Sequence, residues 1–462
     1  NRRYGKEKIP MSLKLTNTLK LGKSLIILIL CCISIYEYIL GFLQITGLLP
    51  YGHTNFAMTG TFENPGPYGG LMAILLAILA AYTYQNITVK TKYGKIVIAI
   101  SLLSCLACFS ALLASYSRAA WLAFGISILF FGFCELNPWR WIKGHKLTCI
   151  TASITAVLLM IGIFLMKKDS AIGRFHIWHI ELRAIMEKPW TGYGRNRVLG
   201  VYGETQADFF SQKTRNDYIT RIAGCPEYAF NEYFKVGIEF GIIAMFGMVL
   251  FLSLIVALLL RQHSPFAYGL ITFSIFAFFS YPLSAIRIKS DAEKEWESNR
   301  YLISMGLYQD AIEKFKPLFN AQKENYRYLY DLGYSLHKIG QYLESNEILM
   351  LGSKISSDPM FHNIMGKNLE ATGNYDGAEN EYLTSHLMVP GRIYPLYLLM
   401  KMKIVLDDTY AAIIIGEKIK KMYVNERVPS MRQMKNECMA MLDSLKTNLN
   451  YTEKAILSST NN

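Results

Sequence analysis

The chain has 462 residues, of which 52% are hydrophobic and 13% aromatic, and its mean hydropathy is +0.20. This composition excludes an ordinary soluble protein and predicts a membrane protein with an attached soluble part. The net charge of +13 falls largely at the ends of apolar segments. We therefore expect membrane lipids, and no nucleic acid, as partners of these charges. The chain begins Asn-Arg-Arg, with no methionine or signal-peptide pattern, so we expect it to be truncated at the front.

Apolar segments near the ~20 residues that cross a bilayer recur up to about residue 289. They predict an all-α fold that begins with a polytopic transmembrane helical bundle. The membrane domain spans 24–289 and follows a basic cytoplasmic segment at 1–23. The seven predicted spans are 24–46, 67–85, 95–114, 118–136, 147–166, 236–260 and 266–286.

Charges between the spans predict the topology. The N-terminal segment is basic, whereas the next loop, TGLLPYGHTNFAMTGTFENPGP, contains no lysine or arginine, so the N-terminus is expected in the cytoplasm. The second, fourth and sixth loops are basic too and fall on the same side. The long loop at 167–234 and the chain after the seventh span are then expected on the outer, periplasmic face of a bacterial inner membrane.

The C-terminal part carries a recurring pattern: GLYQDAIEKF from Gly306, GQYLESNEIL from Gly340 and GNYDGAENEY from Gly373. The glycines are 34 and 33 residues apart, and alanine or serine and then a large apolar residue follow at fixed offsets. The pattern resembles tetratricopeptide repeats and predicts a soluble α-solenoid at 290–425, before a helix and tail at 426–462. Such a solenoid presents a concave surface to a protein partner. The alternative is a stabilising appendage.

Two arginines are expected near the outer interface. Arg118, in SYSRAAWLAF, lies where the fourth span begins, and Arg174 begins the helix after the fifth span. Guanidinium groups bind phosphate oxygens in a bidentate way, so a pair at this depth suits a lipid-linked diphosphate whose charge grows as it leaves. The alternative is that each arginine only reaches the lipid headgroups.

The segment GRFHIWHIELRAIMEKPWTGYG predicts an amphipathic helix in the membrane interface, ended by Pro189 and the glycines that follow. His176 and His179 could pair on a metal, but no third ligand is evident, so we expect no metal and place the pair at the polar edge. The predicted apolar face consists of Phe175, Trp178, Leu182 and Ile185, and Arg174, Arg183 and Glu187 lie off it.

Four motifs in order, TGTFENPGPYGGLM, SYSRAAWLAF, IGRFHIWHIELRAIMEKPWTGYG and AFNEYFKVGIEFGIIA, resemble the O-antigen ligase and polymerase superfamily over about residues 55–260. The resemblance implies a membrane glycosyltransferase that takes a glycan from an undecaprenyl-diphosphate-linked donor, without a cofactor, metal or nucleotide sugar. It implies lipid A core, a growing glycan or a protein hydroxyl as the acceptor. Sequence alone does not separate these three.

The resemblance also implies that Arg118 and Arg174 bind the donor diphosphate, and that a histidine before an asparagine assists the acceptor. Here Phe230 stands before Asn231. A hydroxyl acceptor normally needs a base, and our first choice is Glu232. The other candidate bases are Glu227, His176 and His179, and Glu239 is a further candidate site residue. The remaining candidate substrate-binding residues are Asn64, Asn231, His176, Trp178 and Arg183.

A rival hypothesis comes from another class. The missing histidine favours a non-enzymatic envelope scaffold or glycan transporter, in which the repeats bind envelope proteins and the arginines serve only the interface. Convergence of Arg118, Arg174 and a carboxylate on one outward cavity would favour the enzyme.

Overall fold

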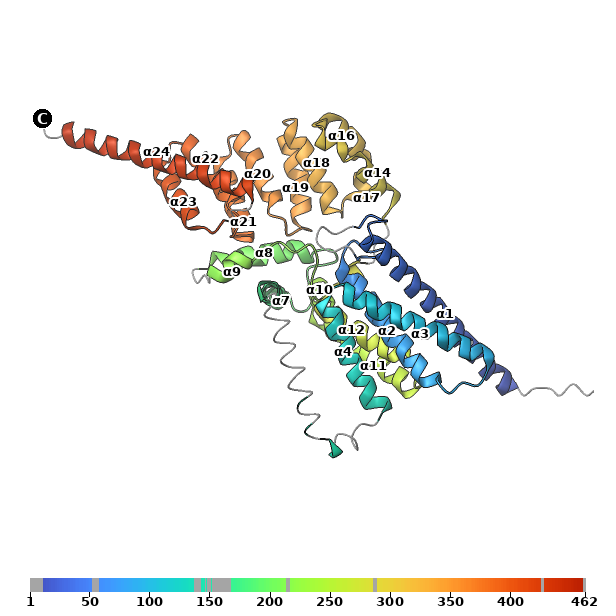
Figure 1. The fold of residues 1–462 in the computed structure, drawn as a ribbon. Helices are drawn as coiled ribbons and strands as arrows, with labels where there is room; N and C mark the ends of the chain where they lie inside the picture. Colours follow the sequence, from blue (N-terminus) through green and yellow to red (C-terminus); the bar gives the residue numbers. More distant parts are fainter. Residues whose placement is uncertain are drawn as a thin grey trace, which may run out of the picture. The chain divides into compact units, whose positions relative to one another are not determined.

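The computed structural model describes residues 11–51, 58–136, 143–145, 147, 151, 168–212, 217–285, 289–424 and 428–459. All regular secondary structure in these ranges is helical, with apolar helices followed by further helices (Figure 1), which confirms the predicted fold class. The chain divides into two compact units. The first comprises Asn1–Met160, Phe230–Tyr233 and Phe246–Ile286, and the second comprises Ile161–Ala229, Phe234–Met245 and Arg287–Asn462.

The first unit is a bundle around α2. This helix packs against α1, α3, α4 and α12 and is the most buried of the long apolar helices. Glycines allow the close packing: a Cβ added at Gly70 would lie 2.1 Å from the ring of Phe276. The helices are α1 (Met11–Ile45), α2 (Pro65–Asn86), α3 (Lys92–Ala114), α4 (Arg118–Glu135), α11 (Ile242–Arg261), α12 (Phe266–Phe279) and α13 (Pro282–Ala285), where α11 begins in the second unit.

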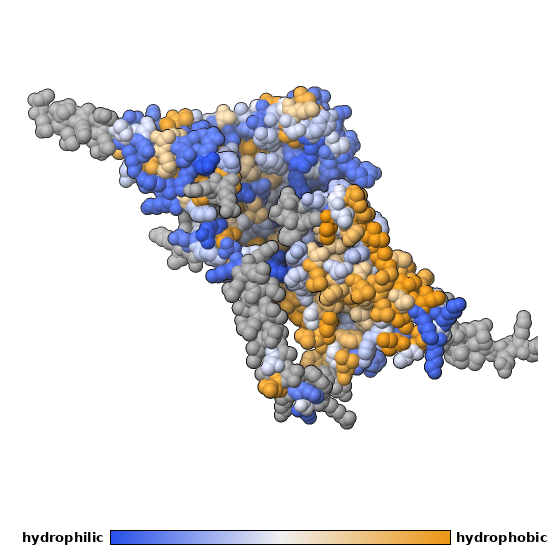
Figure 2. Space-filling view, in the orientation of Figure 1, coloured by the Kyte–Doolittle hydropathy of each residue, from blue (hydrophilic) through white to orange (hydrophobic). Residues whose placement is uncertain are grey.

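Five helices among the described residues are long and apolar enough to cross a membrane, so the protein is a multi-pass membrane protein. They are Gly22–Ile45 within α1, and α2, α3, α4 and α11. Figure 2 shows hydrophobic residues gathered over the helices of the first unit, and many large apolar side chains of α1, α3, α4 and α11 are exposed. Such surfaces suit a lipid environment.

Three predicted spans need comment. The span predicted at 236–260 is wrong at its start, because Gly241 adopts a φ of +86° and divides the stretch into α10 (Glu232–Phe240) and α11. The span predicted at 266–286 is too long: α12 has 14 residues and ends where Ser280 becomes extended. At about 1.5 Å per residue, it is shorter than the ~30 Å hydrocarbon core. Nearly all of the span predicted at 147–166 lies outside the described residues.

The second unit contains the segment between the apolar helices and the C-terminal helices. Helix α7 (Lys168–Glu187) packs against α8 (Val198–Ser211), and α9 (Asp217–Ile222) follows. Most of α10 belongs to this unit, although its first two residues lie in the first. A small apolar core joins α7, α8 and α10 through Ala184, Ile185, Val198, Val201, Ala229 and Ile238.

The C-terminal helices pack mainly in chain order, each against the next. Gly306, Gly340 and Gly373 adopt φ angles of +76°, +82° and +79°, and Asp407 takes the same left-handed conformation at the corresponding place in a further pair. The glycines therefore recur because the turn between two helices requires this backbone. The tetratricopeptide identity of the pairs stays a prediction. The helices are α14 (Asp291–Asn299), α15 (Tyr301–Ser304), α16 (Tyr308–Phe315), η1 (Lys316–Leu318), α17 (Phe319–Gln322), α18 (Tyr326–Lys338), α19 (Tyr342–Ser353), α20 (Met360–Ala371), α21 (Tyr375–Met388), α22 (Tyr394–Val405), α23 (Thr409–Lys421) and α24 (Pro429–Ser459).

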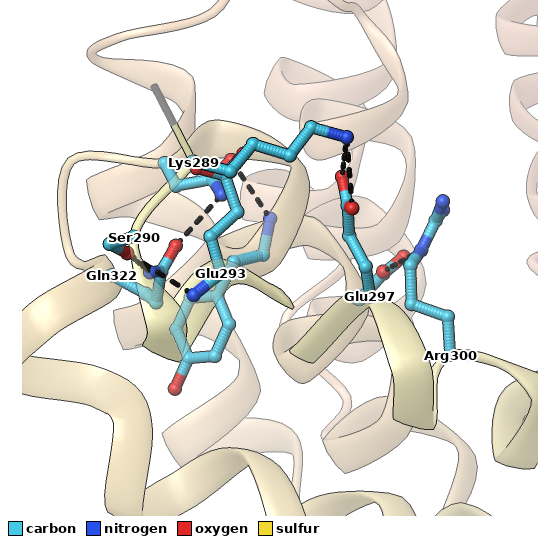
Figure 3. A network of polar contacts seen from close by, with 9 residues as sticks. Lys289, Ser290, Glu293, Glu297, Arg300 and Gln322 are labelled. Atoms are coloured by element: carbon cyan, nitrogen blue, oxygen red, sulfur yellow. Dashed lines mark hydrogen bonds and ion pairs between the residues drawn. The ribbon is translucent and has the colours of Figure 1, made fainter. Parts of the chain in front are cut away.

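A polar network secures the start of this region (Figure 3). The hydroxyl of Ser290 caps α14 by accepting from the Glu293 amide at 3.2 Å, and it also accepts from the Gln322 side chain at 3.2 Å. The ammonium of Lys289 contacts both carboxylate oxygens of Glu297 at 2.9 Å. These contacts tie the first C-terminal helix to α17 and to the chain that enters it.

Candidate functional site

One end of the first unit is built around the loop that precedes α2. The Gln44 amide oxygen of α1 accepts from the backbone amides of Thr59 and Gly60 at 3.0 and 2.8 Å. Two helical turns earlier on α1, the Glu37 carboxylate accepts from the Thr61 hydroxyl and amide at 2.6 and 3.0 Å. Both α1 side chains are buried, so their polar groups are satisfied by the loop. The loop conformation is therefore imposed by α1.

The first helical turns of α2 and α4 meet at this end. Asn64 caps α2 through its Oδ1, which accepts from the Gly66 amide at 2.9 Å. The Ser117 hydroxyl, just before α4, donates to the Gly66 carbonyl at 3.4 Å. Arg118 is the first residue of α4 and is half-buried. Two helix N-termini and a guanidinium thus bring positive potential to one place.

The segment Phe230–Tyr233 reaches the same end. Helix α12 runs antiparallel to α2, because Gly269 near its start faces Ile78 and Phe276 near its end approaches Gly70. Helix α13 follows α12 and contacts α2. The buried carboxylate of Glu232 accepts from the backbone amides of the two residues after Pro282, at 2.8 and 3.1 Å. Glu232 is therefore fixed near the start of α2.

The neighbours of Glu232 are held equally firmly. The Oδ1 of buried Asn231 accepts from the Tyr233 amide at 2.9 Å, as a helix cap does. The ring of Phe230, at the expected histidine position, packs edge-on against Tyr281 with 5.4 Å between centroids. The structure thus brings Asn64, Arg118, Asn231 and Glu232 to one end of one unit. A phenylalanine ring contributes no proton acceptor there.

The other predicted site residues lie in the second unit: Arg174, His176, Trp178, His179 and Arg183 on α7, Glu227 before α10 and Glu239 within it. Glu227 is paired with Arg327 at 2.9 Å. Arg174 and Trp178 are half-buried, and the Trp178 ring packs against Phe234. Arg183 contacts Asp208 of α8 at 3.1 Å. Because Arg118 belongs to the first unit, the predicted convergence of Arg118 and Arg174 stays a prediction.

His176 does not lie at a polar edge as predicted. It is buried against the Phe209 and Phe210 rings, with its Nε2 2.9 Å from the Gln206 Oε1. Burial lowers the pKa of the His176 imidazole, although the Gln206 contact opposes this. Gln206 also donates to the carbonyls of Gly224 and Met388, so it links α7 to the C-terminal helices. Burial thus favours the neutral form of the His176 ring, and Gln206 fixes its position.

The predicted apolar face of α7 is only partly buried. Phe175 and Leu182 are 58% and 45% exposed, whereas Ile185 packs into the small core with α8 and α10. The predicted face is therefore divided along the helix, because residues of α8 and α10 cover Ile185 and leave Phe175 and Leu182 exposed. The exposed apolar residues remain suited to a membrane interface.

The turn after α7 is interlocked with α10. The Tyr193 and Gly194 amides donate to the carbonyls of Ile238 and Glu239 at 2.8 and 3.0 Å. The buried Glu239 carboxylate accepts from the Asn196 amide at 2.9 Å. A Cβ added at Gly192 would lie 2.5 Å from the Glu239 backbone. Glu239 therefore holds the Pro-Trp-Thr-Gly-Tyr-Gly turn in place.

Sequence reasoning missed three buried polar residues. Glu37 and Gln44 are seven positions apart, on one face of an apolar span, and that spacing could have identified them. Glu181 on α7 is 1% exposed, and its Oε2 has no hydrogen-bond partner in the described part of the chain. Burial raises the pKa of the Glu181 carboxyl well above its ordinary value. Within the described residues, no group of three His, Cys, Asp or Glu side chains could hold a metal ion.

A protein-family model described as O-antigen ligase matches residues 103–249, about a third of the 462-residue chain. The matched stretch includes Arg118, Arg174, Asn231 and Glu232. It supports the predicted O-antigen ligase superfamily, a membrane glycosyltransferase-like function, and a lipid-linked glycan and an acceptor as partners in general. No curated protein matches the chain.

Proposed function

We propose that the chain transfers a glycan from an undecaprenyl-diphosphate-linked donor to an acceptor hydroxyl, at the periplasmic face of the bacterial inner membrane. The observation that carries the proposal is the O-antigen ligase match over 103–249, which includes both proposed diphosphate-binding arginines. The acceptor is lipid A core, a growing glycan or a protein hydroxyl. The C-terminal helices, as tetratricopeptide-like repeats, recruit the acceptor or a protein partner.

In the proposed reaction, the acceptor oxygen attacks the anomeric carbon as the bond from that carbon to the diphosphate oxygen breaks. The acceptor loses its proton to a base, and undecaprenyl diphosphate leaves with the extra negative charge. Arg118 and Arg174 bind the diphosphate and stabilise this growing charge. The N-termini of α2 and α4 beside Arg118 support this role because they favour anions.

The proposed base is Glu232. Two backbone amides and the Ser284 hydroxyl contact its Oε1 and fix the position of the carboxylate. A carboxylate is in general a weak base. A weak base suffices where the transition state resembles an oxocarbenium ion and the leaving group is good.

The test compares cells that lack the gene with cells that carry full-length protein bearing Arg118→Ala or Arg174→Ala. We expect both variants to lose glycan transfer by about a hundredfold or more while the lipid-linked precursor accumulates. Lipopolysaccharide ladders and glycoproteins are profiled together, so the missing species identifies the acceptor. Arg195→Ala, an exposed arginine in the same loop, is the matched control. Full transfer by a normally folded Arg174→Ala variant would exclude the diphosphate role.

A non-enzymatic scaffold or glycan transporter is the second candidate. Phe230 favours it, because the ring at the expected histidine position packs on Tyr281 and takes no proton. Under this candidate the arginines only reach lipid headgroups. Deletion would then change a glycan, and both arginine variants would restore it.

A further inference from the structure

One face of the C-terminal helices pairs lysines with tyrosines. The Lys338 ammonium lies over the Tyr334 ring at 5.3 Å, Lys367 over Tyr394 at 5.3 Å, and Lys401 over Tyr397 at 5.3 Å. Lys367 also donates to the Tyr394 hydroxyl at 2.7 Å. We call these six residues the lysine–tyrosine face.

These lysines differ from others in the same region. Within the described residues, none of the three has a carboxylate at ion-pair distance. By contrast, Lys316 pairs with Glu344 at 2.8 Å and Lys403 with Glu379 at 2.7 Å. Each face lysine is held by an aromatic ring instead, which positions the cation without neutralising it. The lysine–tyrosine face therefore retains positive charge that can attract an anionic ligand.

The helices that carry the pairs are in contact with one another. Tyr334 and Lys338 follow Tyr330 at helical spacing on α18, and the α18 His337 contacts Asn368 of α20 at 2.6 Å. Lys367 then connects α20 to α22 through Tyr394.

Electrostatic coupling agrees with these contacts. Burial raises the pKa of the Tyr330 phenol, and Asp358 raises it further. Tyr334 and Tyr394 add to the same shift, so phenols of α18 and α22 lie within electrostatic reach of Tyr330. Of the carboxylates that act on this face, Asp358 pairs with Arg392 and Asp331 with Arg300. Glu437 accepts from the Tyr397 hydroxyl and interacts electrostatically with Lys401, so the charge of Lys401 is partly balanced.

The chemistry of the face favours a glycan over a peptide. Among the described residues of α18 and α20, no large apolar side chain is exposed, and on α22 the exposed one is Val405 at its last position, so the face offers few of the apolar anchors that usually hold peptides. Tyrosine offers a flat apolar ring to the C–H face of a pyranose and a polar tip to its hydroxyls. Ammonium groups add attraction for sugar carboxylates.

We infer that the lysine–tyrosine face binds a carboxylate-bearing glycan of the uronic acid type. The choice of a glycan rests on the proposed function, and the face gives that function a preference for acidic chains. Three separated ammonium groups suit a polymer that carries a carboxylate on successive sugars.

Binding of hexagalacturonate to the purified full-length chain in lipid nanodiscs tests this inference. Neutral maltohexaose and a hexaglutamate peptide are compared at the same salt concentration. We expect the combined Lys338→Gln, Lys367→Gln and Lys401→Gln changes to weaken hexagalacturonate binding by about tenfold, since three solvent-accessible charge contacts together are worth about that much. The control replaces the exposed Lys314, Lys420 and Lys421 with Gln, which removes the same charge from other helices and is expected to leave binding unchanged.

Equal weakening by both triple variants would overturn the inference, because it would indicate only general charge attraction. Hexaglutamate binding as tight as hexagalacturonate binding would also overturn it, in favour of an acidic peptide. Tyr394→Phe keeps the aromatic ring and is expected to retain most hexagalacturonate binding. Tyr394→Leu removes the ring and is expected to weaken this binding. The assay contains no donor lipid and Arg174→Ala is expected to bind normally, so failure here is distinct from failure of the proposed transferase.

Discussion

Two buried carboxylates in the O-antigen ligase match have opposite surroundings. Glu232, at the end of the first unit, is 2% exposed and accepts hydrogen bonds from two backbone amides. Glu181, between α7 and α8 in the second unit, is 1% exposed, and its Oε2 has no partner among the described residues. The first carboxylate joins two segments of the chain through these hydrogen bonds. The second is tolerated only at a cost, and mainly when protonated.

The contrast shows how two regions use polar groups. At the end of the first unit, turns supply backbone amides to Glu37, Gln44 and Glu232, so charge and loop conformation stabilise each other. Around α7, the buried polar groups come from helices whose own amides are already bonded. Gln206 contacts His176 there, whereas the Oε2 of Glu181 has no hydrogen-bond partner within the ranges that the structure describes. We expect substitutions to affect the two regions in opposite directions.

The largest effect is expected for Glu232→Ala. The change removes the acceptor for the Leu283 and Ser284 amides, which costs about 2–4 kcal/mol in the free energy of unfolding. Glu232→Gln keeps an oxygen that can accept from both amides, so its stability should stay within about 1 kcal/mol of the parent. Thermal unfolding in detergent micelles measures the difference.

The same pair of variants tests the proposed base. If Glu232 takes the acceptor proton, Glu232→Gln should fold normally and lose transfer by about a hundredfold or more. Transfer at the parent rate would assign Glu232 to structure alone. An alanine variant as stable as the parent would contradict the hydrogen-bonding role instead.

The next effect has the opposite sign. Glu181→Met removes a buried carboxyl whose Oε2 lacks a hydrogen-bond partner in the described part of the chain, so it should stabilise the α7–α8 pair by about 1–3 kcal/mol at pH 8. Hydrogen exchange of the α7 and α8 amides reports this local stability. Ile180→Met, a neighbouring core change on the same helix, is the packing control and should destabilise or be neutral.

The pH dependence of the Glu181 effect follows from its raised pKa. The folded protein favours the protonated Glu181 carboxyl. Its contribution to the stability of the fold is fully present below the unfolded-state pKa near 4.3 and is lost as the pH rises through the higher pKa of the folded state. Glu181→Gln should abolish that loss. A parent protein whose α7 exchange does not accelerate with rising pH, after correction for intrinsic exchange, would contradict the buried carboxyl.

The sequence could predict features that depend on local chemistry. The left-handed turns at Gly306, Gly340 and Gly373 and the cap at Asn64 follow from residue type and spacing. Glu181 was not recognised because a lone glutamate in an amphipathic helix is usually exposed, and only the docking of α8 buries it. The environment of Glu232 was missed for a related reason. Its partners follow it by about fifty residues and meet it only in the folded bundle.

A smaller effect is expected for His176, on the acid side of the pH dependence of α7 hydrogen exchange. Burial lowers its pKa, so the fold favours the neutral ring. That contribution is present above the ordinary pKa near 6.5 and is lost as the pH falls through the lower folded value. His176→Gln should flatten the acid limb of α7 exchange at a cost of about 1 kcal/mol at pH 7.5. An unchanged acid limb would mean that His176 titrates normally and is exposed.

The smallest effect is expected for Asp208→Asn, which breaks the 3.1 Å contact with Arg183. The two side chains are 57% and 30% exposed, so the ion pair is screened by solvent and worth less than about 1 kcal/mol. Arg183 also lies over the Phe209 ring at 5.6 Å and should keep its place.

If Arg183 binds the anionic donor, releasing it from Asp208 should lower KM at low salt and leave kcat and α7 exchange unchanged. If Arg183 only joins α7 to α8, KM should stay constant and the exchange of both helices should rise slightly at low salt. Kinetics at low and high salt, with Asp208→Glu as the control that keeps the charge, distinguish substrate binding from helix packing at this arginine.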